Sequence, residues 1–214
     1  YFDRARAERA ARRQVRRGYD VHLGASLAYS TLGHLRDPLL NTMLTADDAE
    51  LAARMFHELA HQAVYAADDS DFSEAFASVV EDEGVRRWLL HLDRGPDLVE
   101  FQAARARQQR IAERMLESRS RLASLYAGRP DPERMRSEKA AELTRLRAAL
   151  ADLGLRDAGE LNNARLAAIA TYYHCVPPLV AELARLDNDL PNFYAHMKRV
   201  ARDPAARREL CPGS

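Results

Sequence analysis

Two helical patterns separated by a short acidic break constrain the fold of this chain more than any other feature. The first pattern covers about 45–64, with Thr45 as the expected N-cap and Asp48 in the place of a shortened capping box. Its apolar positions recur at helical spacing, at Leu51, Met55, Phe56, Leu59 and Ala60. The run AADDSD at 66–71 ends this pattern, and a second helix is expected over 72–92. The stretch therefore predicts two antiparallel helices joined by a short connector.

Most of the remaining chain also has helical patterns. Further helices are expected over 2–17 (ended by Gly18), 97–126, 132–152, 160–175, 178–187 and 191–202. The two long ones flank the turn GRPDP at 128–132, which predicts a projecting antiparallel helical hairpin. These patterns predict a mainly α protein divided into 1–96, the 97–152 hairpin and C-terminal helices in 153–214.

One segment, 19–31, has an extended pattern instead. Val21 and Leu23, then Leu27 and Tyr29, suggest two short strands around Gly24. The predicted fold therefore includes a small β element.

Charge and composition argue against several partners. Lys and Arg together number 32, as do Asp and Glu, so the chain has no net field that would attract nucleic acid or an anionic membrane. Arginine is concentrated in 1–17 and 103–121, where solvated helix faces explain it better than a nucleic-acid site. No apolar run is long enough for a transmembrane helix. We therefore expect no nucleic-acid partner and no membrane span, and the sequence leaves the oligomeric state open.

The sequence leaves open both the location of the protein and the oxidation state of its two cysteines. The chain begins at Tyr1 without a methionine, which indicates a fragment or a processed product, so the lack of a signal peptide predicts nothing about location. Cys175 and Cys211 are too few for a disulfide framework and too far apart for a Cys-x-x-Cys site. One bridge between them is an open alternative.

The chemistry concentrates in the helix that contains His57 and His61. These histidines stand at i and i+4 and share one face, where both imidazoles can bind one Zn²⁺, and Glu58 between them can act as a general base. A catalytic zinc needs a third protein ligand. If the two helices are antiparallel, Glu74 lies opposite His61, which suits direct coordination. Glu81 lies two turns further on and suits a hydrogen bond to a ligand histidine.

The motifs HELAHQ and SEAFASVVE resemble those of the thermolysin-like (gluzincin) zinc aminopeptidases. Further blocks, AYSTLG, DPLLNTML and LNNARLAAIATYY, resemble the bacterial family of putative zinc aminopeptidases over most of the chain. The resemblance implies a zincin-like core in 1–96, zinc held by His57, His61 and Glu74, Glu58 as base and Glu81 behind the ligands. It also implies a bacterial periplasmic or lipoprotein location.

The chain departs from that pattern in two places. Ser73 replaces the asparagine that usually precedes the ligand glutamate, which removes one donor near the metal without removing a ligand. The G-x-M-E-N strand that captures a substrate α-amine is replaced by GASLAYSTLG, which has no acidic residue. The peptidase interpretation is therefore better supported than its restriction to aminopeptidase.

Other polar residues have weaker claims to a role. A tyrosine near the metal could donate to the developing oxyanion, and Tyr172 or its neighbour Tyr173 is a candidate, although half-buried aromatics have the same pattern. Asn163 and Arg165 could bind a peptide substrate, but helix capping and surface charge explain them nearly as well. The sequence thus predicts a zinc-dependent, aminopeptidase-like peptidase. The alternatives are a metallohydrolase for non-peptide amides and a helical interaction module that keeps a metal site.

Overall fold

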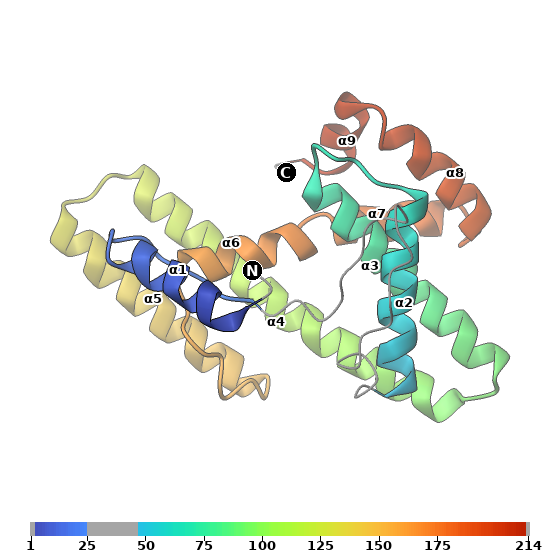
Figure 1. Ribbon diagram of the computed structural model, residues 1–214, viewed down its shortest axis with the longest axis horizontal. Coiled ribbons are helices and arrows are strands. Elements are labelled where there is room, and N and C mark those ends of the chain that lie inside the picture. Colours follow the sequence, from blue (N-terminus) through green and yellow to red (C-terminus); the bar gives the residue numbers. More distant parts are fainter. Residues whose placement is uncertain (1–2, 25–46, 213–214) are drawn as a thin grey trace. The chain divides into compact units, whose positions relative to one another are not determined.

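The computed structural model describes residues 3–24 and 47–212, and within them the chain is built from helices (Figure 1). The helices are α1 (Arg4–Val15), α2 (Asp48–Ala63), α3 (Ser70–His91), α4 (Gly95–Ala127), α5 (Pro132–Asp152), α6 (Asn163–Tyr173), α7 (Val176–Arg185), α8 (Leu190–Val200) and α9 (Pro204–Leu210). The prediction of a mainly α fold is confirmed. No helix in these described ranges is both long and apolar enough to cross a membrane.

The expected strands are absent from the part of 19–31 that the structure describes, residues 19–24. There the backbone is irregular, and the carbonyl of Val21 accepts a hydrogen bond from the Asn162 side chain at 2.9 Å. Asp20 in the same segment pairs with Lys139 at 2.7 Å. The Asn162 side chain thus bonds the backbone here in place of a neighbouring strand, and the strand prediction is wrong for Val21 and Leu23. Leu27 and Tyr29 lie outside the described residues.

The chain forms two compact units, whose boundaries fall within α4 and α6: 1–25 with 106–170, and 26–105 with 171–214. They do not coincide with the three ranges predicted from the sequence, because the 97–152 hairpin is divided after Arg105.

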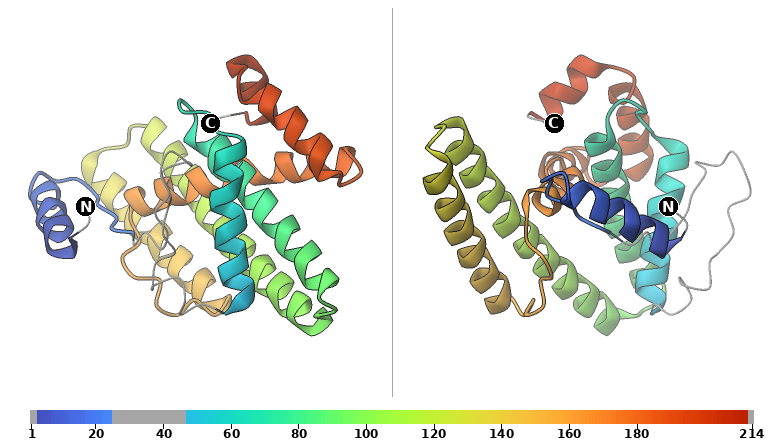
Figure 2. Two further views of the ribbon diagram at one scale, coloured as in Figure 1. Left: turned by 45° about the vertical axis from the view of Figure 1, so that its right-hand side comes forward. Right: turned by 60° about the vertical axis from the view of Figure 1, so that its left-hand side comes forward.

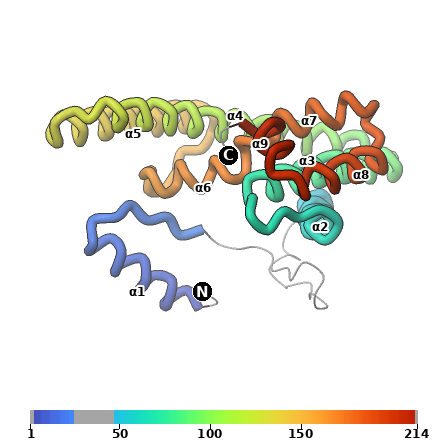
Figure 3. The backbone as a smooth tube through the Cα atoms, turned by 90° about the horizontal axis from the view of Figure 1, so that it is seen from above, coloured from blue at the N-terminus to red at the C-terminus, as the bar shows by residue number. Residues whose placement is uncertain are grey.

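The first unit contains the helical hairpin. The later part of α4 runs antiparallel to α5, as Figure 2 and Figure 3 show. Their facing sides and the segment that leads into α6 share one apolar core, made of Met115, Leu122, Leu146, Leu150, Ala158, Leu161 and Leu166. Asp131 caps α5 through the backbone amides of Glu133 and Arg134, with Pro132 in the first turn. The predicted bounds of this helix, 132–152, are confirmed.

The second unit contains the expected antiparallel pair, α2 and α3, with α7, α8 and α9 packed nearby (Figure 1). Its main core joins α3 to α7 and α8, where Phe76 stacks on Phe193 with ring centroids 5.7 Å apart. A second cluster joins α2 and α3 to the first turns of α4 through Ala53, Val85, Leu89, Leu98 and Phe101. The unit thus fixes α3 on several sides.

The helix starts differ from the sequence expectation because aspartates cap them. Asp47 accepts a hydrogen bond from the Glu50 amide at 2.8 Å and caps α2, whereas Thr45 lies outside the described residues. Asp69 accepts from the Phe72 amide at 3.0 Å, so α3 begins at Ser70 and not at Phe72. An aspartate side chain at the N-cap accepts hydrogen bonds from the free backbone amides of the first turn, and this fixes where the helix begins.

Cys175 and Cys211 form a disulfide within the second unit, with Cα atoms 5.3 Å apart. The sequence left this pairing open. The bond joins the N-cap of α7 to the C-cap of α9, a helix that the sequence analysis missed. Disulfides of this kind are typical of proteins that fold in an oxidising compartment.

Candidate metal centre

Three side chains from α2 and α3 converge in the second unit. His57 and His61 lie one turn apart on α2, and their Nε2 atoms are 3.2 Å apart. Glu74, on the first turns of α3, places Oε2 at 3.3 Å from His57 Nε2 and Oε1 at 3.7 Å from His61 Nε2. The expectation that Glu74 lies opposite His61 agrees with this geometry.

These separations suit a tetrahedral metal ion. Ligands about 2.0–2.1 Å from a tetrahedral zinc lie ~3.3 Å from one another. The nearest separations between the three donor side chains, 3.2 to 3.7 Å, are close to that value. Two imidazoles and one carboxylate are also the donor set of a catalytic zinc site, which keeps its fourth position open.

Glu81 fixes the orientation and tautomer of His57. Its Oε2 lies 3.0 Å from His57 Nδ1, and because an ionised carboxylate only accepts hydrogen bonds, the proton must be on Nδ1. The Nε2 of a neutral His57 therefore presents a lone pair to Glu74 and His61. The His57 lone pair and the Glu74 carboxylate both face His61 Nε2, and a divalent metal would bind all three groups with His61 in the tautomer that leaves its Nε2 unprotonated.

Arg105, near the first turns of α4, supports Glu81 in turn. Its guanidinium forms an ion pair with Glu81 Oε1, while its Nε lies 2.9 Å from an Asp82 carboxylate oxygen. The same guanidinium lies over the Phe101 ring at 4.8 Å from the centroid. The sequence analysis missed Arg105, because it is 24 residues from Glu81 and no local spacing connects the two.

Protonation at the cluster favours metal binding. Burial lowers the pKa of His61, and the neighbouring His57 lowers it further, against the opposing effect of Glu74. For Glu74, burial acts to raise the pKa, but the hydrogen bond with His57 and the charges of both imidazoles outweigh it and leave the pKa lowered. A neutral imidazole and an ionised carboxylate are the forms that bind a metal ion.

Two further predicted residues lie at the same site. Glu58 follows His57 on α2 and is half-buried. Burial raises the pKa of Tyr172, and the charges of Glu74 and Glu58 raise it further, which places the Tyr172 hydroxyl within electrostatic reach of both carboxylates. Because its pKa is raised, the Tyr172 hydroxyl is protonated at neutral pH, and the residue is 47% exposed.

Tyr173 has different neighbours. Burial raises the pKa of Tyr173, while Arg105 lowers it and Asp82 raises it. Tyr173 therefore lies near the Arg105–Asp82 pair and not near the metal cluster. Of the two tyrosines, Tyr172 is the better candidate for the oxyanion donor.

Asn163 and Arg165, the predicted substrate-binding residues, belong to the first unit. Asn163 Oδ1 accepts a hydrogen bond from the Tyr126 hydroxyl at 2.9 Å. The Arg165 guanidinium donates to the carbonyl of Ala158. Both side chains therefore have structural partners, and a contact with substrate stays a prediction.

One comparison with known proteins gives a match. The family model described as "Putative aminopeptidase" matches residues 1–211. The chain belongs to this family. The matched residues include both units and every residue of the metal cluster. No curated protein and no solved structure matches the chain.

Proposed function

We propose that this member of the putative aminopeptidase family is a zinc-dependent peptidase whose metal is held by His57, His61 and Glu74. The observation that carries the proposal is the convergence of these donors from two helices at separations that suit one tetrahedral ion. Nitrogen and carboxylate donors favour zinc over magnesium or calcium, which prefer oxygen ligands alone. A carboxylate as third ligand supports the gluzincin interpretation, in which α2 and α3 belong to a zincin-like core.

Zinc at this site would supply a Lewis acid that polarises the scissile carbonyl and makes water acidic near neutral pH. The protein supplies the proton transfers. Glu58, next to the ligand His57, accepts a proton from the attacking water and passes it to the leaving amine, so that the carboxylate is regenerated. Tyr172 donates a hydrogen bond to the oxyanion that develops on the carbonyl oxygen.

Glu81 and Arg105 contribute through His57. The Nδ1–H bond to Glu81 holds the imidazole in the tautomer that leaves Nε2 free for the metal. The ion pair with Arg105 holds Glu81 in place. Both are therefore positioning residues that do not touch the substrate.

The proposal is tested by the variant Glu58→Gln, which keeps the side-chain shape but loses the base. Hydrolysis of leucine p-nitroanilide by the zinc-loaded chain should fall about 10²- to 10⁴-fold, with bound zinc unchanged. Glu50→Gln, an exposed glutamate of the same helix, is the matched control and should keep full activity. Full activity of the Glu58 variant, or activity of the metal-free chain, would refute the mechanism.

The same assay separates the substrate classes. An aminopeptidase cleaves the free α-amine substrate and rejects its N-acetylated form, whereas an endopeptidase cleaves internal bonds of longer peptides. Cleavage of acyl amides alone would instead favour a hydrolase for non-peptide amides. We expect the first result, because the family description specifies aminopeptidase.

A further inference from the structure

The connector between α2 and α3 controls the geometry of the metal cluster. It covers 64–69, so it begins three residues after His61 and ends five residues before Glu74. A shift of α3 along α2 by a single residue would move Glu74 by about 1.5 Å, which is a large part of a metal–ligand distance. The connector therefore helps to set the distance between the ligands, together with the packing of α3 against α2 and α7.

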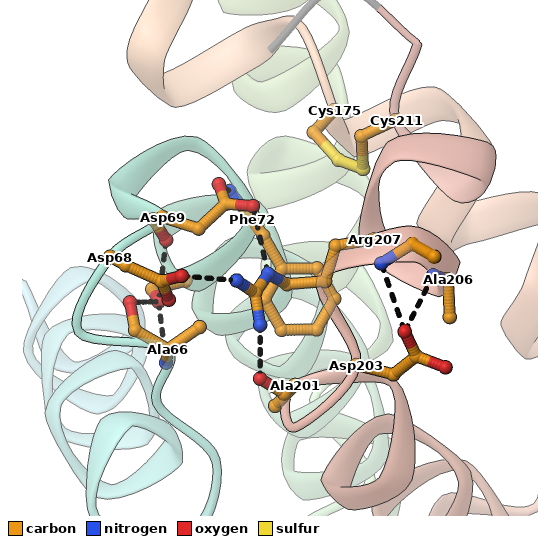
Figure 4. Close-up of polar contacts among 12 residues, drawn as sticks. Ala66, Asp68, Asp69, Phe72, Cys175, Ala201, Asp203, Ala206, Arg207 and Cys211 are labelled. Carbon is orange, nitrogen blue, oxygen red and sulfur yellow. Dashed lines mark hydrogen bonds and ion pairs between the residues drawn. A yellow bond between two sulfur atoms is a disulfide. The ribbon is translucent and has the colours of Figure 1, made fainter.

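Arg207 of α9 reaches that connector (Figure 4). Its Nη2 donates to Asp68 at 2.7 Å and its Nε donates to Asp69 at 3.0 Å, while Nη1 donates to the carbonyl of Ala201. Arg207 is only 4% exposed. A buried guanidinium with several hydrogen bonds in a planar arrangement has little freedom to move, so it defines the place of its partners.

The Arg207 contacts continue into α3. Asp69 uses its second oxygen to cap α3 at the Phe72 amide. Ser73, which is fully buried, accepts a hydrogen bond from the Ala66 amide at 3.1 Å, and its hydroxyl lies within donating distance of the carbonyls of Ala66 and Asp69. Ser73 directly precedes Glu74, so one continuous set of contacts joins Arg207 to the third donor of the cluster.

The disulfide holds the helix that carries Arg207. Cys211 ends α9 four residues after Arg207, and Cys175 begins α7, which packs on α3. His174 lies 3.0 Å from the carbonyl of Pro212 and makes a second link at the same place. A helix as short as α9 is marginal in isolation, so the covalent bond to α7 keeps Arg207 close to the connector.

We propose that Arg207 is a positioning residue for the metal centre: from α9, which the Cys175–Cys211 bond anchors, it fixes the connector that sets Glu74 against His57 and His61. This inference rests on the proposed metal site. It explains why Ser73 in place of asparagine is compatible with that site, because Ser73 secures the connector.

The test measures Zn²⁺ affinity of the full chain by competition with a chromophoric chelator, together with the visible absorption of the Co²⁺-loaded protein. Arg207→Gln should raise the dissociation constant on the order of tenfold, the lower end of the effect of residues that support metal ligands, and should change the Co²⁺ spectrum. Arg207→Lys should recover part of the affinity. Arg208→Gln, an exposed neighbour on the same helix, should match the wild type.

A purely structural role predicts a different result. Arg207→Gln would then melt at a lower temperature without metal, but the folded protein would bind Zn²⁺ with unchanged affinity, and this outcome overturns the inference. If Arg207→Gln does not fold, Asp68→Asn decides, because the Asp68 side chain is 69% exposed and its loss removes one ion pair only. Asp68→Asn should weaken Zn²⁺ binding by a smaller factor, and an unchanged affinity again overturns the inference.

The disulfide is tested by Cys175→Ser combined with Cys211→Ser. This change should weaken Zn²⁺ binding in the wild type more than in the Arg207→Gln background, because both act through α9. Equal effects in the two backgrounds would overturn the role of the disulfide. A wild-type chain that binds no Zn²⁺ at all contradicts the proposed function, whereas equal binding by wild type and variants contradicts only the role of Arg207.

Discussion

At the scale of single residues, the site depends on side chains with unequal tasks. Glu74 faces both imidazoles directly, while Glu81 contacts only the far nitrogen of His57 and receives Arg105 on its other oxygen. Removal of a metal ligand should prevent metal binding, whereas removal of a residue that only orients a ligand should weaken metal binding.

Glu74→Ala should therefore bind no measurable Zn²⁺, while Glu81→Ala and Arg105→Gln should each weaken binding about 10- to 100-fold. Chelator competition on the purified variants measures both effects. Glu100→Ala, an exposed change elsewhere on α4, is the control. Equal losses in the Glu74 and Glu81 variants would contradict the assignment of Glu74 as the ligand.

The sequence predicted these residues to different extents. The spacing of His57, Glu58 and His61 on one helix required no tertiary information, and the antiparallel connection indicated Glu74 over Glu81 as the inner carboxylate. Arg105 and Arg207 were out of reach, because each meets its partner only through tertiary packing, 24 residues away for Glu81 and 138 residues away for Asp69.

At the scale of elements, α2 and α3 approach closely where Gly84 of α3 meets Phe56 of α2. A Cβ atom at Gly84 would lie 2.9 Å from two atoms of the Phe56 ring, which is too close for undisturbed packing. Phe56 directly precedes His57, so this contact lies beside the cluster. Because glycine has no Cβ atom, it allows the two helices to approach closely at this position.

We expect Gly84→Ala to lower the free energy of unfolding by about 1 kcal/mol, because overpacking outweighs the gain in helix propensity. Chemical denaturation measures the difference. Gly95→Ala is a suitable control, since a Cβ there meets nothing within 4 Å. A Gly84 variant as stable as the Gly95 variant would show that Phe56 moves aside without cost.

The elements themselves were largely predictable because apolar periodicity and turn residues mark them in the sequence. The ends of the helices were less predictable. Asp47 and Asp69 cap α2 and α3, whereas the sequence favoured Thr45 as the cap of α2 and a later start for α3. The short helix α9 was missed because seven residues carry little periodicity. The strand expected around Val21 and Leu23 is absent, and the Val21 carbonyl instead accepts a hydrogen bond from the side chain of Asn162, which lies far along the chain.

At the scale of the whole molecule, the family match extends over 1–211 and thus over both compact units. The metal cluster, Tyr172, the disulfide and Arg207 all belong to the second unit, while Asn163, Arg165 and the helical hairpin beyond Arg105 belong to the first. The proposed catalytic groups therefore all lie in the second unit. The sequence could not show this division, because both units are assembled from segments distant in the chain.

The most direct measurement is a titration of the metal-stripped full chain with Zn²⁺, alongside His61→Ala and the exposed control His91→Ala. We expect saturation at one ion per chain for the wild type and the His91 variant, and loss of that binding in the His61 variant. A wild-type chain without saturable binding, or a His61 variant that binds as the wild type does, would contradict it.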